Sequence, residues 1–380
     1  MEKKTCGIGV IGCGTYCGAY LKNLGPKYKN VRPVACADLN QAAAEKAATD
    51  WNIPTVCTSD ELVQNPDVDI VLILTTPASH YSLTMAALRA GKHVFCEKPL
   101  TTSLEQANEI VEYAQAHGLF VGSAPDTFLT PEFQTVRKLI DDGEIGRVVS
   151  VTANFMGPGA DLWHPNASFL YKKGGGPALD MAPYFFTVLV SLLGPIESIF
   201  SFANRGFDKR VIRGQEISVD VMTNYCGVLQ FANGAIGNIN LGFDEWKASL
   251  PGLEIYGTEG VIIAPDPNTM GGPIKLLKAN DFVALVESKT QMLEKIGAIY
   301  GPESATLFRE VETVVPRCGN ERGLGIADMA DAILTGRKPK VSGELCRHVT
   351  EAINAFDVSI QTHKPYDLTS TCEKPEPLYS

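Results

Sequence analysis

A short apolar run that ends in a glycine-rich turn is the feature that most constrains the fold. Residues 5–11 read as a strand and lead through Gly12, Gly14 and Gly18 into a helix-like segment at 16–24. Glycines let the backbone turn tightly between strand and helix and approach a phosphate closely. The third glycine lies one position later than in the GxGxxG spacing, so a turn without a ligand is the alternative interpretation.

Strand-like and helix-like segments then alternate along the first third of the chain, a pattern typical of βαβ units around a parallel sheet. The apolar runs lack alternation, which fits strands buried on both faces. We therefore expect a dinucleotide-binding Rossmann domain over residues 1–124. Its further predicted strands are 32–37, 69–74, 93–96 and 120–122, and its further predicted helices are 41–51, 81–90 and 103–117.

After residue 124 the strand-like segments alternate, which indicates an open, mainly antiparallel sheet. We expect a second α/β domain over residues 125–380, built on that sheet for substrate binding and oligomerisation. One face of an open sheet must be covered, so we expect a homodimer or homotetramer through it. The strand-like segments are 148–154, 218–231, 235–243 and 252–256, and two late helix-like stretches, 326–334 and 345–361, could pack back on either domain.

Composition narrows the functional classes. The net charge is −10 with no basic cluster, which argues against nucleic acid as a partner. No run approaches the ~18 apolar residues of a membrane helix. The charged start and the glycines that follow it differ from a signal peptide, so we expect a cytoplasmic protein. The ten cysteines include no CxxC pair, and we expect no metal site.

Asp38 supports a dinucleotide site because it follows the predicted strand 32–37. An acidic residue at about this distance from a glycine turn accepts hydrogen bonds from the adenosine ribose. No Arg or Lys follows closely to hold a ribose phosphate, so we expect NAD rather than NADP. The alternative is that Asp38 caps the next helix, and one residue could serve both roles.

Four motifs in this order resemble the Gfo/Idh/MocA oxidoreductase family over nearly the whole chain. They are Gly12-Cys13-Gly14, Thr75-Thr76-Pro77-Ala78-Ser79-His80, Cys96-Glu97-Lys98-Pro99 and the segment 174–184. The resemblance implies hydride transfer between a nicotinamide cofactor, NAD(P), and a ring hydroxyl of a sugar, cyclitol or glycoside. The residues that it places at the cofactor are Gly12, Gly14, Thr15, Tyr16, Asp38, Thr75, Thr76, His80, Glu97 and Lys98.

The resemblance implies that Lys98 is catalytic and lies between nicotinamide and substrate. Pro99 restricts Lys98 to an extended backbone, which would project its side chain from the strand end into the ligand crevice. An ammonium there can stabilise a developing alkoxide or lower the pKa of a neighbouring base. The alternative is a surface lysine that pairs with Glu97.

Asp180 and Tyr184 are four residues apart and would share one face of a helix that begins near Pro177. Tyr184 stands where many family members have His as the acid/base. A phenol could act as a base near neutrality only with a lowered pKa, which Lys98 and a substrate hydroxyl could provide. The alternative is that Tyr184 is an aromatic core residue.

His164 is a second candidate for the base, because it lies in a polar, aromatic loop ahead of the glycines and histidine titrates near neutrality. An ordinary surface histidine is the alternative. Trp163 offers an apolar face to a sugar ring. We therefore expect Trp163, His164, Asp180 and Tyr184 to bind substrate, and His80 to line the cofactor without performing chemistry.

Two other functions remain open within the same resemblance. One is a redox-neutral enzyme that keeps NAD bound and cleaves a glycosidic bond. The other is a non-enzymatic sugar or dinucleotide sensor. The presence of Lys98, Asp180 and a hydroxyl group at position 184 argues against the sensor.

Overall fold

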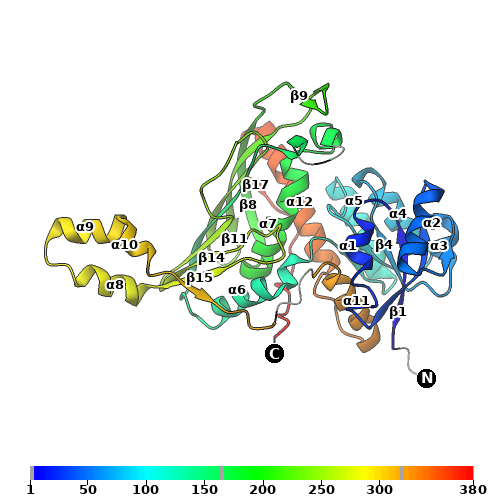
Figure 1. Cartoon of the computed structure of the whole chain (residues 1–380), viewed down its shortest axis with the longest axis horizontal. Helices are drawn as coiled ribbons and strands as arrows, with labels where there is room; N and C mark the ends of the chain where they lie inside the picture. Colours follow the sequence, from blue (N-terminus) through cyan, green and yellow to red (C-terminus); the bar gives the residue numbers. More distant parts are fainter. Residues whose placement is uncertain (1–3, 163, 165–166, 317–320, 380) are drawn as a thin grey trace.

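The computed structural model describes residues 4–162, 164, 167–316 and 321–379, and its first part is built on a parallel sheet (Figure 1). Six strands lie in the order β3-β2-β1-β4-β5-β6, and every neighbouring pair runs parallel. This order confirms the expected Rossmann sheet. The elements are β1 (Cys6–Ile11), α1 (Cys17–Leu21), β2 (Val31–Ala37), α2 (Gln41–Trp51), β3 (Thr55–Val56), α3 (Ser59–Gln64), β4 (Ile70–Ile73), α4 (Pro77–Arg89), β5 (His93–Cys96), α5 (Leu104–Ala116) and β6 (Val121–Ser123).

Burial explains which of these elements the sequence indicates. Every residue of β1 and β4 is buried, so both strands read as unbroken apolar runs. The pattern does not indicate β3, which has two half-buried residues, or α3, which starts with a capping box formed by Thr58 and Glu61. Helix α1 is shorter than the predicted 16–24, and Asn23 beyond its end donates a hydrogen bond to the Arg322 carbonyl instead (2.7 Å).

Nine strands form the second sheet, in the order β16-β15-β14-β13-β7-β12-β11-β8-β17. Neighbouring strands are antiparallel except β7 and β12, which run parallel. The expected open, mainly antiparallel sheet is therefore confirmed. Its strands are β7 (Val148–Met156), β8 (Ile196–Asn204), β11 (Asn224–Phe231), β12 (Ile236–Gly242), β13 (Leu253–Gly257), β14 (Gly260–Ala264), β15 (Ile274–Lys278), β16 (Arg309–Val311) and β17 (Tyr366–Asp367).

One face of this large sheet is covered by helices and the other face is open. Helices α6 (Pro131–Asp141), α7 (Pro177–Leu193) and α12 (Gly343–Thr362) lie on the covered side, and α7 and α12 separate the large sheet from the Rossmann sheet (Figure 1). Leu229 and Ile239 point to the covered face and are buried, whereas Val228 and Ile236 point to the other face and are exposed. Core packing therefore occupies one side of the sheet only.

The late helices join the two sheets. Helix α11 (Leu324–Thr335) contacts β2 and β6, while α12 contacts α5 and β6 on one side and α7 and β8 on the other. The amide of Ser123 at the end of β6 donates to the Cys346 sulfur of α12 (3.1 Å). The predicted domain boundary at residue 124 stays a prediction, since the last helices pack on both parts.

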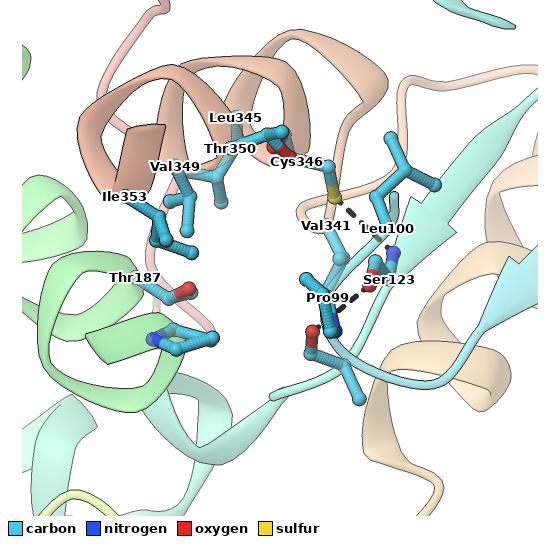
Figure 2. A pocket seen from close by; sticks show the side chains of 12 residues that line it. Pro99, Leu100, Ser123, Thr187, Val341, Leu345, Cys346, Val349, Thr350 and Ile353 are labelled. Atoms are coloured by element: carbon cyan, nitrogen blue, oxygen red, sulfur yellow. Dashed lines mark hydrogen bonds between the residues drawn. The ribbon is translucent and has the colours of Figure 1, made fainter. Parts of the chain in front are cut away.

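Figure 2 shows the seam where α7 and α12 meet the loops after β5 and β6. Its lining is mostly apolar, and the space that remains measures about 10 Å³, enough for roughly one water molecule. The seam holds Pro99, the residue after Lys98, against the second sheet's helices. It is lined by Pro99, Leu100, Ser123, Ala124, Pro183, Thr187, Val341, Leu345, Cys346, Val349, Thr350 and Ile353.

Smaller elements complete the chain. The hairpin of β9 (Lys209–Ile212) and β10 (Gln215–Ser218) stands apart from the large sheet. Helices α8 (Ala279–Glu287), α9 (Met292–Tyr300) and α10 (Pro302–Ala305) connect β15 to β16, and three 3-10 turns are η1 (Thr127–Leu129), η2 (Ala160–Leu162) and η3 (Ala167–Tyr171). Among the residues that the structure describes, none of the helices combines the length and apolar character that a bilayer span requires.

Candidate active site

The glycine-rich turn after β1 lies at the carboxyl end of the parallel sheet, where such sheets bind ligands. Gly12 has a φ of 101°, and a Cβ atom there would lie 2.8 Å from the carbonyl of Leu74, so close packing of two strand ends requires glycine. A Cβ atom on Gly14 would meet nothing within 4 Å. Gly14 thus leaves open space beside the turn, which a ligand could occupy.

Asp38 follows β2 and ties it to the glycine turn. Its Oδ2 accepts a hydrogen bond from the Cys13 amide (2.7 Å), and its Oδ1 accepts one from the Asn40 amide (2.8 Å). The N-cap residue of α2 is Asn40, so Asp38 is not the cap. Each carboxylate oxygen keeps a further lone pair, with which it can accept a hydroxyl group.

The segment after β4 presents Thr75 and Thr76 to a cavity between the two sheets, and His80 supports that segment from behind. The His80 ring is fully buried, with Nδ1 2.7 Å from the Pro99 carbonyl oxygen and Nε2 3.0 Å from the Thr75 carbonyl oxygen. His80 is not among the described residues that line the cavity. It joins the loop after β4 to the loop after β5 instead.

Lys98 follows β5 and reaches across to the first turn of α7. Its Nζ donates a hydrogen bond to the Asp180 carbonyl (2.8 Å) and another to the Asp180 carboxylate. Only 15% of the Lys98 side chain is exposed, so the alternative of a solvated surface lysine does not describe it. Burial alone would lower the pKa of Lys98, but the Asp180 carboxylate outweighs burial and raises it. The side chain is therefore an ammonium group held at the crevice.

Tyr184 lies one helical turn after Asp180, and the Lys98 Nζ sits 5.2 Å from the centre of its ring. The phenol is buried, and burial raises the pKa of Tyr184 to about 12, although the charges of Lys98 and Arg322 act in the opposite direction. The lowered pKa that a base would need is therefore absent from this arrangement of the described residues. At neutral pH the phenol keeps its proton, which suits a proton donor.

Arg322 is a buried cation beside this group that no sequence motif indicates. Its Cζ lies 5.8 Å from the centre of the Tyr16 ring and 5.9 Å from that of Tyr20. Tyr20 in turn donates a hydrogen bond to Glu97 Oε1 (2.7 Å), and Glu97 Oε2 accepts one from the Lys98 amide (3.0 Å). Glu97 therefore holds the backbone of Lys98 in place, while the ammonium group of Lys98 bonds to Asp180.

These groups meet at a cavity of about 430 Å³, within the size range of small-molecule sites. His164 also lines it, with its ring 5.6 Å from Phe169 and nearly perpendicular to it. Trp163 lies outside the described residues. Of the predicted site residues, the cavity brings together Tyr16, Thr75, Thr76, Glu97, Lys98, His164, Asp180 and Tyr184, while Gly12, Gly14, Thr15 and Asp38 lie along the neighbouring sheet edge.

Arg210 holds one wall of the cavity, and no local sequence pattern marks it. Its Nη1 donates to the Pro158 carbonyl (3.0 Å) and to both Asp161 carboxylate oxygens (3.0 and 3.1 Å). Its Nη2 donates to the Phe243 carbonyl (2.7 Å) and to the Asp244 carboxylate. Pro158 and Phe243 both line the cavity, so this buried network sets the position of the wall.

Comparison with known families agrees with this architecture. Residues 6–124 match the family described as an oxidoreductase family with an NAD-binding Rossmann fold, and residues 133–263 match the GFO/IDH/MocA C-terminal domain. The two matches occur in this order along the chain. They cover the glycine turn, Lys98, Asp180 and Tyr184.

Two curated relatives carry names of sugar and cyclitol enzymes. The chain is 33% identical over 214 residues to 1,5-anhydro-D-fructose reductase from Ensifer adhaerens, which covers 55% of this chain and 60% of that protein. It is 26% identical over 213 residues to myo-inositol 2-dehydrogenase from Thermotoga maritima, which covers 54% of this chain and 58% of that protein. The matched region thus spans about three fifths of each relative.

Solved structures share the whole fold. An NAD-binding oxidoreductase from Klebsiella pneumoniae superposes with a TM-score of 0.80 and 22% identity, over 97% of this chain and all of that one. Levoglucosan dehydrogenase in complex with NADH and levoglucosan superposes with a TM-score of 0.79 and 22% identity, over 96% of this chain and all of that one. With both domain matches and the Rossmann sheet in place, the chain belongs to the GFO/IDH/MocA oxidoreductase family.

Proposed function

We propose that this protein is an NAD-dependent oxidoreductase that transfers hydride between a nicotinamide and a ring hydroxyl carbon of a sugar, cyclitol or glycoside. The observation that carries the proposal is the convergence of Lys98 with Asp180 and Tyr184 at the 430 Å³ cavity. Lys98 comes from the end of β5 and the other two from α7, so the site spans both sheets. The names of the reductase and the inositol dehydrogenase support this substrate class.

The sheet edge fits a dinucleotide. Gly14 leaves open space at the turn, Asp38 offers carboxylate lone pairs, and Thr75 and Thr76 face the cavity. The negative charge of Asp38 would repel a ribose phosphate, and no Arg or Lys follows it closely, which favours NAD over NADP. We assign cofactor binding to Gly12, Gly14, Thr15, Tyr16, Asp38, Thr75, Thr76, Glu97 and Lys98, with His80 supporting the two loops.

Bound NAD would supply the carbon that accepts or donates hydride. The Lys98 ammonium then stabilises negative charge on the substrate oxygen, and Asp180 holds that ammonium in place. The pKa of about 12 favours Tyr184 as the donor of a proton to this oxygen during reduction. His164 lines the same cavity and is the candidate that accepts the proton during oxidation. Trp163 stays a predicted substrate contact.

The test follows the absorbance of reduced nicotinamide when purified protein meets NAD and a panel of sugars, inositols and glycosides. We expect NADH to form with at least one member of the panel and NADP to serve less well. Lys98→Met should lower turnover by about a hundredfold or more while NAD binding persists. Lys172→Met is the matched control, because Lys172 pairs with Asp220 at the surface (3.0 Å).

The same assay separates the competing functions. A redox-neutral enzyme would cleave a glycoside without net formation of NADH and would release its cofactor only on denaturation. These results would contradict the dehydrogenase assignment. Binding of sugar and NAD without any turnover would identify a sensor. Unchanged turnover in Lys98→Met would contradict the catalytic assignment itself.

The open face of the large sheet leads to a proposal about assembly. Phe202, Val228 and Ile236 are each more than half exposed there, whereas the opposite face is covered by helices. An apolar sheet face of this kind marks an interface. We propose a homodimer or homotetramer that buries this face.

A further inference from the structure

A second cavity lies behind the wall that Arg210 holds at the 430 Å³ active-site cavity. It measures about 220 Å³, and we call it the outer cavity. The turn η2 faces both cavities, since Ala160 and Leu162 line the active-site cavity whereas Asp161 between them lines the outer cavity. Pro158 lines both. The two cavities are therefore neighbours that share one thin wall.

Two exposed aromatic side chains line the outer cavity. Phe207 lies just before β9 and is 46% exposed, and Trp246 follows β12 and is 81% exposed. Strand β9 contacts η2, so the hairpin is held against the wall of the active-site cavity. Aromatic faces that are open at a cavity offer a flat apolar surface to a ring of a ligand.

The charged groups of the outer cavity favour a neutral ligand that carries hydroxyl groups. Arg210 pairs with Asp161 (3.0 Å) and with Asp244, and all three line the outer cavity. Lys209, the other cation there, pairs with Glu216 (2.6 Å). The two carboxylates oppose an anion, and the guanidinium group opposes a cation. The carboxylate oxygens keep lone pairs that can accept hydroxyl groups.

The size of the outer cavity suits part of a ligand. Its volume of about 220 Å³ lies below the roughly 300 Å³ at which sites for complete ligands begin. The active-site cavity holds Lys98 and Tyr184, so the reacting ring belongs there. A molecule of two linked rings can place one ring in each cavity and its linkage at Pro158.

We propose that the substrate is a glycoside with a second sugar ring, which packs against Trp246 in the outer cavity while the first ring reacts beside Lys98. This inference rests on the proposed hydride transfer and specifies its substrate class. The first ring loses a hydride to NAD and a hydroxyl proton to the base, and the second ring takes no part in the chemistry. Its contacts raise kcat/KM for two-ring substrates by adding binding energy.

The first test compares sugars that share the reacting ring and differ in the second. The pairs are methyl β-glucoside with cellobiose, methyl α-glucoside with maltose, and methyl β-galactoside with lactose. In the native protein we expect kcat/KM for NADH formation to be about tenfold higher for the two-ring member of at least one pair, and Trp246→Ala should lower this ratio about fivefold or more. General damage to the enzyme would lower both members alike and leave the ratio unchanged.

Tyr300→Ala is the matched control for this ratio. Tyr300 is an exposed aromatic residue (84%) on α9 and is not among the described residues that line either cavity. The control should keep the native ratio. A native ratio near one in all three pairs, or a ratio that Trp246→Ala leaves unchanged, would overturn the second-ring site while NADH formation still supports the reaction.

The second test measures binding without turnover, by calorimetry on Lys98→Met with NAD bound. We expect the two-ring member of the reacting pair to bind about tenfold more tightly, and the added Trp246→Ala change to remove most of this gain. The same binding difference in a protein whose native form yields no NADH would support the second-ring site and contradict the proposed reaction. Tighter binding of phenyl β-glucoside than of methyl β-glucoside, without a gain for any disaccharide, would overturn the assignment of a sugar ring to the outer cavity.

Discussion

Two opposing effects act on the phenol of Tyr184. Burial raises its pKa, while the positive charges of Lys98 and Arg322 lower it, and burial prevails so that the pKa is about 12. The sequence indicates Lys98 and Tyr184 but not how deeply the phenol is buried. The burial of the phenol follows from the packing of α7 between the two sheets. Because burial raises the pKa of Tyr184, it favours the phenol as a proton donor over a proton acceptor.

Tyr184→Phe tests the proton donor with little change in volume. We expect the turnover of ketone reduction to fall by a factor of about 10² to 10⁴, the usual contribution of a general acid, while NADH binding is retained. In the native protein a group with a pKa of about 12 stays protonated between pH 7 and 10. Deprotonation of Tyr184 should therefore cause no fall in the reduction rate over this pH range.

Stopped-flow measurement of NADH oxidation against pH checks both points. Tyr366→Phe is a matched control, since the Tyr366 hydroxyl donates to Glu351 of α12 (3.0 Å) and Tyr366 does not line the cavity. Reduction by Tyr184→Phe at the native rate would transfer the donor role to another group, with His164 the first to examine.

Residues that belong to a local motif could be predicted from the sequence, and residues that act through tertiary contacts could not. Lys98, Asp180 and Tyr184 stand in motifs with recognisable order and spacing. Arg322 and Arg210 reach their partners only in the folded chain, and the Arg210 bonds to Asp161 and Asp244 span long stretches of sequence. Side-chain roles of this kind depend on the three-dimensional packing.

At the scale of elements, burial separates what could be predicted from what could not. Strands β1 and β4 of the Rossmann sheet are buried throughout, and their unbroken apolar runs indicate them, whereas the half-buried β3 has no such run. Strands β14 and β15 and helices α8, α9 and α10 were not indicated. In α8 and α9 the apolar residues face solvent, so their spacing does not point to a core. A prediction based on burial within one chain therefore does not indicate helices whose apolar residues are exposed.

Helix α12 carries a buried histidine that links it to the large sheet. His348 Nε2 accepts a hydrogen bond from the Ile196 amide (2.9 Å), and its Nδ1 lies 3.1 Å from the Ser370 carbonyl oxygen. Burial lowers the pKa of His348 to about 4, against the opposing charge of Glu351. In the unfolded chain the imidazole binds a proton near pH 6.5, so the unfolded state is favoured as the pH falls from 6.5 to 4.

The native protein should therefore lose stability on acidification, with His348 contributing up to about 3 kcal/mol between pH 6.5 and 4. His348→Gln keeps an acceptor for the Ile196 amide and removes the titrating group. We expect this variant to be less stable at pH 7.5 and to show a flatter dependence of its melting temperature on pH. Differential scanning calorimetry from pH 4.5 to 7.5 measures this, with the exposed His117→Gln as control. Parallel curves for both variants would contradict the assignment.

In the whole molecule the two sheets are coupled by one helix layer. Helix α12 packs on α5 and β6 of the Rossmann part and on α7 and β8 of the second part, and α11 also contacts β2 and β6. In the seam of Figure 2, side chains of α12 line the same small cavity as Pro99, the residue that follows the catalytic candidate Lys98. Stability and site geometry therefore depend on the same contacts, although the sequence left open which part the late helices would join.

Leu345→Ala should loosen this coupling. Leu345 is buried in the seam, and removing a buried leucine side chain costs about 2–5 kcal/mol. Leu62→Ala removes an equally buried side chain from the Rossmann part alone and is the matched control.

Urea unfolding followed by circular dichroism and by tryptophan fluorescence reports on both parts, since Trp51 lies in α2 and Trp246 follows β12. We expect one transition in the native protein and in Leu62→Ala, but two separated transitions in Leu345→Ala, because its parts no longer stabilise each other across the seam. A single transition in both variants would mean that the coupling does not pass through α12.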